Sequence, residues 1–329
     1  MFLKLIYFVF MLSFSVCALA KPLIIAHRGA SGYIPEHTLP ALAYAYAAGA
    51  DYIEQDLVLS KDDQLVVLHD IHLDTVSNVA QVFPSRRRSD GRFYAIDFTL
   101  AELKQLHLHE RTNLKGEAVF KNRYQANTEF KITTFAEQIA FIAQLNRQTG
   151  RKVGLYPEIK SPFWHKEQGK DISKAVIKVL RQHNLDKVDA EIYVQCFDFN
   201  EVKRLKNELN LKAKLVLLIG ENSWQESDTD YDFLRTPAGL KQVAKVTQFI
   251  GPRIEHLIDF NSGQITDFAK SAKALNLKIH PYTHRVETLP VNLSQNDMFD
   301  VLVYQIEING LFTDFTDKFF KYLSAQENK

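Results

Sequence analysis

Three carboxylates in this sequence have a spacing that could hold a metal ion. Glu54 and Asp56 lie two residues apart in an apolar stretch, so their side chains share one face of the expected strand. Glu158 ends another apolar stretch, and no cysteine lies near any of the three. Carboxylates that face a protein interior cannot all stay ionised without a compensating positive charge. Oxygen ligands of this kind predict a hard divalent cation, Ca2+ or Mg2+ rather than Zn2+.

Two histidines and two basic residues also stand where expected strands end. His27 and His69 can exchange protons near neutral pH, one as a general acid and the other as a general base. Arg28 and Lys160 provide positive charge for an oxyanion, and the planar fork of arginine suits phosphate because it binds two oxygens. A metal, an acid–base pair and two cations favour phosphoryl transfer over acyl transfer. The alternative is a salt-bridge cluster in which Arg28 and Lys160 hold the carboxylates without a metal.

The pattern along the chain predicts the elements that must position these residues. Apolar runs of strand length alternate with segments of helical period, some of which begin with a capping box, such as Thr134 with Glu137. About eight strands in a chain of this length predict an α/β fold, a (β/α)8 TIM barrel, whose active-site groups gather at the carboxyl ends of the strands. The expected strands are residues 23–26, 51–59, 65–68, 153–158, 192–195, 215–219, 278–282 and 310–313.

One region breaks the alternation of strands and helices. Residues 71–133 are polar and irregular, and they are too many for a simple connection. We therefore predict a small inserted subdomain after an early strand. The arginine run at residues 86–88 lies in it and is interpreted as a solvated loop, with a phosphate contact as the alternative.

The first 20 residues have the pattern of a cleaved secretory signal. Lys4 precedes a short apolar stretch that meets an A-x-A site at residues 18–20. That stretch is about 15 residues, which is shorter than the ~20 residues that span a bilayer as a helix. We expect residues 1–20 to be removed, leaving residues 21–329 as one domain in the periplasm without stable membrane insertion. An uncleaved anchor and a lipid on Cys17 are the alternatives.

Composition excludes several classes of protein. Of the 329 residues 46% are hydrophobic and 24% are charged, which excludes wholesale disorder. Lys and Arg number 40 against 39 Asp and Glu, so no basic excess predicts a nucleic-acid partner. Cys196 would be the only cysteine after the leader is removed, and its apolar surroundings predict a buried, inert thiol. The oligomeric state does not follow from the sequence.

Eight sequence blocks resemble, in order and spacing, the glycerophosphodiester phosphodiesterase family. Among them are an A-H-R-G-A block at residues 26–30 and a Y-P-E-I-K block at residues 156–160. The resemblance runs from about residue 22 to residue 322 and is closest to the bacterial periplasmic type. The other blocks are residues 35–38, 51–56, 67–70, 194–198, 280–283 and 310–314.

The resemblance implies a TIM barrel with a small insertion and a metal-dependent hydrolase. Its substrates would be glycerophosphodiesters such as glycerophosphocholine and glycerophosphoethanolamine, and its products sn-glycerol 3-phosphate and an alcohol. His27 and His69 would act as base and acid, and Arg28 and Lys160 would lie on the phosphate side. The attacking group would be the glycerol 2-hydroxyl of the substrate or water. The ligands of the metal, Ca2+ in the periplasmic type, would be Glu54, Asp56 and Glu158.

Two positions depart from the family pattern, and two other functions stay open. Many relatives have Asn at the position of His37 and Trp at the position of Tyr282, which bears on details of the substrate pocket. A phospholipase C or D acting on intact lipid would favour an exposed apolar element, and none is evident outside the leader. A non-catalytic surface or binding protein on the same scaffold would show no turnover.

Overall fold

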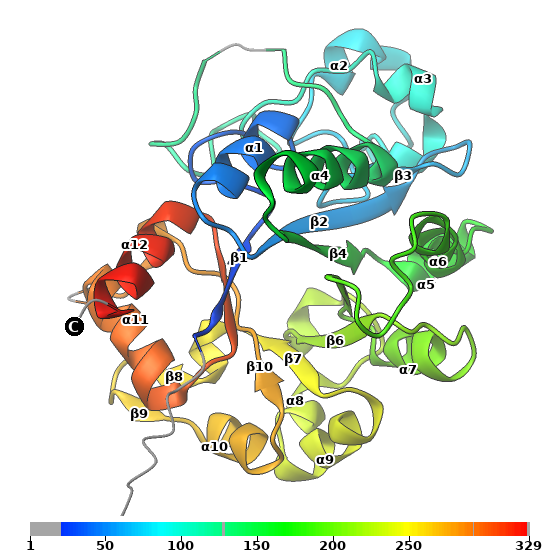
Figure 1. Cartoon of the computed structure of the whole chain (residues 1–329). Helices are drawn as coiled ribbons and strands as arrows, with labels where there is room; N and C mark the ends of the chain where they lie inside the picture. Colours follow the sequence, from blue (N-terminus) through cyan, green and yellow to red (C-terminus); the bar gives the residue numbers. More distant parts are fainter. Residues whose placement is uncertain (1–20, 127–128, 292, 328–329) are drawn as a thin grey trace, which may run out of the picture.

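The computed structural model describes residues 21–126, 129–291 and 293–327, and a barrel of parallel strands lies at its centre (Figure 1). Hydrogen bonds join neighbouring strands in the order β10, β7, β6, β5, β4, β2, β1, β11. Each of these pairs is parallel. The strands are β1 (Leu23–Ala26), β2 (Tyr52–Leu59), β4 (Gly154–Ile159), β5 (Tyr193–Cys196), β6 (Lys214–Ile219), β7 (Phe249–Pro252), β10 (Lys278–Ile279) and β11 (Gly310–Thr313).

The ring closes between β11 and the segment that continues β10. The N–H of Asn309 donates to the carbonyl of Ile279 at 2.9 Å, and the N–H of Phe312 donates to the carbonyl of Pro281 at 3.0 Å. Helices surround the barrel (Figure 1), so the predicted (β/α)8 TIM barrel is confirmed. The main ones are α1 (Leu39–Ala47), α4 (Phe135–Thr149), α6 (Ile172–Gln182), α7 (Phe199–Asn207), α9 (Pro237–Val246), α10 (Asp267–Ala274), α11 (Gln295–Asp300) and α12 (Thr316–Glu327).

A layer of apolar and aromatic side chains fills the barrel interior below the site. Because side chains alternate along a strand, the residue two positions further on points into the barrel above this layer. Tyr52 on β2 is thus followed by Glu54, and Tyr156 on β4 is followed by Glu158. The members of the layer are Ile25, Tyr52, Tyr156, Tyr193, Val216 and Phe312.

Two details of the strand prediction were wrong. The expected strand at residues 65–68 is β3 (Leu65–Val67), which pairs antiparallel with β2 and lies outside the ring. The barrel strand β7 was not predicted. An antiparallel pair, β8 (Ile258–Asp259) with β9 (Gln264–Ile265), adds a small second sheet.

The segment after β3 packs as a small unit on one side of the barrel. It contains α2 (Val79–Val82) and α3 (Leu100–Leu103), which cover a hydrophobic cluster separate from the main core. Two of its arginines pair with carboxylates of the same segment, Arg86 with Glu102 and Arg88 with Asp97, both at 2.7 Å, and each arginine side chain stays 32% exposed. The exact limits of the insertion stay a prediction.

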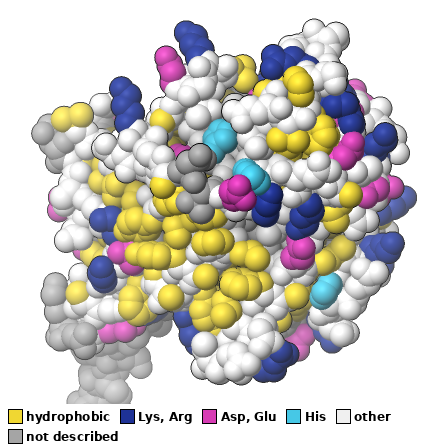
Figure 2. All heavy atoms as spheres, turned by 90° about the horizontal axis from the view of Figure 1, so that it is seen from above, with side chains coloured by type: hydrophobic (Ala, Val, Ile, Leu, Met, Phe, Trp, Pro, Cys, Tyr) yellow, Lys and Arg dark blue, Asp and Glu magenta, His cyan; other side chains and the backbone are white. Residues whose placement is uncertain are grey.

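The predicted leader lies outside the described residues. Within the described part of the chain, no helix is both long enough and apolar enough to cross a bilayer. Cys196 is free and buried on β5, and burial raises the pKa of its thiol, which fits the expected inert group. On the face shown in Figure 2, acidic and basic side chains lie among one another, and the largest group of hydrophobic side chains lies near the centre, with smaller groups apart from it.

Candidate active site

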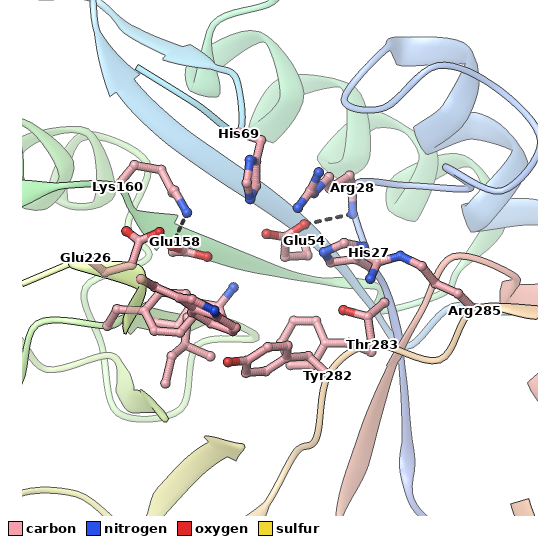
Figure 3. A pocket seen from close by; sticks show the side chains of 15 residues that line it. His27, Arg28, Glu54, His69, Glu158, Lys160, Glu226, Tyr282, Thr283 and Arg285 are labelled. Atoms are coloured by element: carbon pink, nitrogen blue, oxygen red, sulfur yellow. Dashed lines mark hydrogen bonds and ion pairs between the residues drawn. The ribbon is translucent and has the colours of Figure 1, made fainter. Parts of the chain in front are cut away.

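A cavity of about 260 Å³ lies above the aromatic layer, at the carboxyl ends of the barrel strands. We call it the active-site cavity, and Figure 3 shows the side chains around it. Six of the seven predicted site residues line it, while Asp56 lies buried beside Glu54 without reaching its wall. The six are His27, Arg28, Glu54, His69, Glu158 and Lys160.

Glu54 and Asp56 form a buried acidic pair with one additional histidine. The imidazole Nε2 of His37 lies 2.8 Å from one carboxylate oxygen of Asp56, whose other oxygen is buried and has no hydrogen-bond partner. Ligand atoms of His37, Glu54 and Asp56 all lie within 4.8 Å of one another. Burial and the neighbouring Asp56 raise the pKa of Glu54 well above its usual value. This is the geometry of a potential cation site, and it includes a histidine that the sequence had marked only as a departure.

Glu158 lies next to this group but is paired with Lys160. The Lys160 ammonium is 2.7 Å from the Glu158 carboxylate. Burial raises the pKa of Glu158 to about 8 although Lys160 opposes the shift. The same carboxylate raises the pKa of Lys160 against the effect of burial, so the lysine stays charged. The Lys160 ammonium is therefore held at the cavity wall, where it can interact with an anionic substrate.

Arg28 connects the first strand to the acidic pair. Its backbone adopts a positive φ of 59°, and its N–H donates to Glu54 at 2.7 Å. Its guanidinium lies 3.0 Å from Glu36 and 3.3 Å from Asp56. The planar fork is thus largely engaged by carboxylates, and the remainder faces the cavity.

His27 is oriented by a buried carboxylate from the other end of the chain. Its Nδ1–H donates to Asp314 at 2.6 Å, and Asp314 also accepts from Arg123 at 2.6 Å and from Arg285 at 2.9 Å. Burial, with a contribution from Arg28, lowers the pKa of His27 to about 3 even though Asp314 favours the charged form. His27 is therefore neutral at neutral pH, with Nε2 free to accept a proton.

His69 has the same arrangement on the other side of the cavity. Its Nδ1–H donates to Asp70 at 2.7 Å, and Asp70 accepts from Arg111 at 2.6 Å. Arg111 also pairs with Glu36 at 2.5 Å, which links this histidine to the Arg28 network. Burial and Arg28 lower the pKa of His69. The site thus contains two histidines, each fixed through Nδ1 by an aspartate.

Several residues that line the active-site cavity, or that hydrogen-bond to its side chains, were not predicted from the sequence. Asp314 and Glu36 stand inside two of the quoted blocks, so their role could have been sought there. Arg111 lies in the irregular insertion, where no periodic pattern marks it. The cavity wall opposite the charged residues is largely apolar and aromatic (Figure 3). Its members are Phe197, Leu218, Trp224, Tyr282 and Phe312.

Removing the charge of Asp314 is expected to impair catalysis by His27 without weakening substrate binding. Asp314→Asn should lower kcat about 10–100-fold with little change in KM, because the imidazole loses its fixed orientation. The pKa of His27 should fall further without the anion, so the acidic limb of the kcat/KM profile should shift to lower pH. Asp317→Asn, which changes a carboxylate that accepts from Tyr33 at 2.7 Å, is the matched control. An unshifted profile would show that Asp314 acts only on the fold.

Known proteins share both the sequence and the fold of this chain. The model of the glycerophosphoryl diester phosphodiesterase family matches residues 27–318. The chain belongs to this family. A glycerophosphodiester phosphodiesterase of Haemophilus influenzae is 41% identical, with 92% of this chain and 90% of that protein covered. One of Treponema pallidum is 36% identical, with 93% of each covered. The predictions of the family and of a phosphodiesterase are therefore confirmed.

Solved structures agree with the barrel. A phosphodiesterase of Oleispira antarctica, solved in complex with the product sn-glycerol-3-phosphate, superposes with a TM-score of 0.62 at 21% identity, covering 92% of this chain and 97% of that one. The glycerophosphodiester phosphodiesterase of Thermotoga maritima gives a TM-score of 0.57 at 20% identity, covering 92% and 98%. At these identities the likeness concerns the fold alone.

Proposed function

We propose that this protein hydrolyses glycerophosphodiesters to sn-glycerol 3-phosphate and an alcohol, with His27 and His69 as base and acid. The observation that carries this proposal is the pair of aspartate-fixed histidines on the wall of one cavity, next to Glu54, Asp56 and Glu158, which we call the carboxylate cluster. The substrates would be deacylated phospholipids such as glycerophosphocholine and glycerophosphoethanolamine. The family membership and the product bound by the Oleispira antarctica phosphodiesterase support this choice.

The carboxylate cluster fits a divalent cation, and we propose Ca2+ with Glu54, Asp56 and Glu158 as its ligands. The donors are carboxylate oxygens, which suit Ca2+, and His37 could add a nitrogen. One buried carboxylate oxygen of Asp56 has no hydrogen-bond partner among the described residues, so it is available to bind a cation. When bound, the cation would offset the carboxylate charge and polarise a phosphate oxygen.

The two histidines would move the protons of the reaction. The Nε2 of His27 would take the proton of the attacking group, which is the glycerol 2-hydroxyl or water. Attack by the 2-hydroxyl would form a cyclic phosphate as the alcohol leaves, and water would then open the ring to give sn-glycerol 3-phosphate. His69 would give a proton to the leaving alcohol oxygen. Its pKa is lowered in the free protein, and the negative charge of a bound phosphodiester would raise it again. A 2-deoxy substrate that is cleaved at the normal rate would identify water as the attacking group.

The test is a coupled assay that detects sn-glycerol 3-phosphate. Purified protein is given several glycerophosphodiesters and, in parallel, micelles of intact phospholipid. Release of glycerol 3-phosphate from the soluble diesters supports the proposal. Hydrolysis of micellar lipid alone would replace it by a phospholipase, and absence of turnover on both would point to a binding protein.

We also propose that the protein is exported to the periplasm and loses residues 1–20. The support is the sequence of this segment, which lies outside the described residues. Intact-mass measurement of the exported protein should give a chain that begins at Lys21. A retained leader, or a lipid on Cys17, would contradict cleavage.

A further inference from the structure

A second, wider cavity of about 680 Å³ opens beside the active-site cavity. We call it the outer cavity. Its walls are the start of the insertion at residues 70–72, the helix α5 (Pro162–Glu167) and the loop of residues 222–228 that follows β6. The two cavities meet at shared wall residues, which are His69, Lys160, Trp224 and Glu226.

The position of His69 determines which part of a diester would enter the outer cavity. This step rests on the proposed function, in which His69 gives a proton to the leaving alcohol and therefore lies within hydrogen-bond reach of its oxygen. The phosphate is expected beside Lys160 and the carboxylate cluster. The remainder of the alcohol then extends past His69, and the space on that side is the outer cavity.

The outer cavity has an excess of negative charge. Within the described residues, Glu167, Glu226 and Asp228 line it without a hydrogen bond or a close ion pair, although Glu226 lies near enough to Lys160 to raise the pKa of that lysine. The charged groups that remain in its wall already have partners: Lys160 pairs with Glu158 at 2.7 Å, and Asp70 with His69 and Arg111. His72 does not offset the acidic groups, because burial lowers its pKa. Glu167 and Asp228, together with Glu226, whose neighbour Lys160 is already paired with Glu158, therefore give the wall a net negative charge toward a bound ligand.

Aromatic rings stand next to these carboxylates. Phe163, Trp164 and Trp224 line the outer cavity, with 53% of Phe163 and 43% of Trp224 exposed. Trp164 is held by stacking on Tyr94, with ring centroids 5.5 Å apart. An exposed aromatic face beside carboxylates attracts an ammonium group through its quadrupole and through charge.

Two arginines approach the same rings, and both are neutralised by carboxylates. Arg88 lies 6.0 Å from the Trp164 ring and pairs with Asp97 at 2.7 Å. Arg253 lies 5.6 Å from the Trp224 ring and pairs with Glu221 at 3.0 Å. Neither lines the outer cavity, so its wall keeps its acidic character.

We infer that the outer cavity is the head-group site and that it selects alcohols bearing an ammonium group, with Glu226 and Trp224 as specificity-determining residues. Glu226 lies nearest to the reaction among these three carboxylates, because it also lines the active-site cavity beside Lys160 and Glu158 (Figure 3). A neutral alcohol of the same shape would fit the space but lose the attraction of the carboxylates.

The test compares glycerophosphocholine with its uncharged isostere, the 3,3-dimethylbutyl diester of glycerol 3-phosphate. The readout is the ratio of the two kcat/KM values, which cancels any general loss of activity. The wild type should favour the choline diester, and Glu226→Gln should lower the ratio about three- to tenfold. Trp224→Leu, which keeps an apolar side chain without the ring, should lower it as well. Raising the salt concentration should lower the wild-type ratio, since screening weakens exposed charges.

The matched control is Glu208→Gln, which removes an exposed carboxylate at the end of α7, outside both cavities, and should leave the ratio unchanged. A wild-type ratio near one would overturn the inference. A loss in Glu226→Gln that is equal for both diesters would overturn it too, because it would reflect chemistry or folding. If the wild type released glycerol 3-phosphate from neither diester, the proposed function itself would fail, which is a separate result.

Discussion

Replacing His69 by alanine is expected to lower kcat about 10²–10⁴-fold, which is the usual contribution of a positioned acid or base. The loss follows from the geometry, because Asp70 fixes Nδ1 and leaves Nε2 as the group that faces the cavity. The fold should survive, since this side chain is partly exposed at the cavity wall rather than packed in the core. Steady-state kinetics and circular dichroism measure the two effects.

Diesters with different leaving alcohols distinguish the proposed acid, His69, from the proposed base, His27. A diester with p-nitrophenol as its alcohol leaves without needing a proton, so His69→Ala should lose much less activity on it than on glycerophosphocholine. His27→Ala removes the proposed base and should lose a similar factor on both substrates. His107→Ala is the control, because that histidine lies in the insertion with a similar exposure and lines neither cavity. Near-normal turnover of a folded His69→Ala protein would remove the histidine from the mechanism.

The barrel follows from the alternation of strand and helix patterns along the chain. The charged wall of the site follows from the alternation of side chains along each strand. Glu54 and Asp56 share a face because a strand repeats every two residues, and the same rule places Glu158 above Tyr156. Local pattern is sufficient for such predictions. It is not sufficient to assign the partner of a strand, which is why residues 65–68 were placed in the barrel although β3 turns back on β2. The strand β7 was missed because Gly251 and Pro252 interrupt its short apolar run.

Contacts between distant segments could not be read from the sequence. His27 and Asp314 are 287 residues apart, and only the parallel pairing of β1 with β11 brings them together. Glu226 and Trp224 lie in a loop after β6 without a regular period, so no spacing rule marks them. Their role depends on the tertiary structure, because the position of this loop places both side chains in the wall of the outer cavity.

Removal of divalent cations is expected to abolish activity and to lower the melting temperature of the wild type. Several kcal/mol of transition-state stabilisation by a cation correspond to a loss of roughly 10²-fold or more. A cation that binds only the folded state at 100 times its Kd adds about 2.7 kcal/mol to the free energy of unfolding. Thermal unfolding with chelator, and again after Ca2+ is restored, measures this effect independently of catalysis.

Glu54 is the carboxylate that distinguishes a metal site from a salt-bridge cluster. Lys160 pairs with Glu158 at 2.7 Å and Arg28 lies 3.3 Å from Asp56, so those two carboxylates have cationic partners. Within the described residues Glu54 accepts only the backbone N–H of Arg28, and burial raises its pKa well above the usual value. A buried carboxylate in this situation destabilises the metal-free protein.

Glu54→Gln should therefore act in opposite directions with and without Ca2+. The glutamine keeps the shape and the oxygen that accepts from Arg28, so the metal-free variant should melt at or above the temperature of the metal-free wild type. With Ca2+ present the order should reverse, because the variant has lost a charged ligand and with it the stabilisation by binding. Glu208→Gln should keep the full response to Ca2+. Full activity after exhaustive chelation, together with a melting temperature that Ca2+ does not change, would establish instead that Arg28 and Lys160 alone hold the carboxylates.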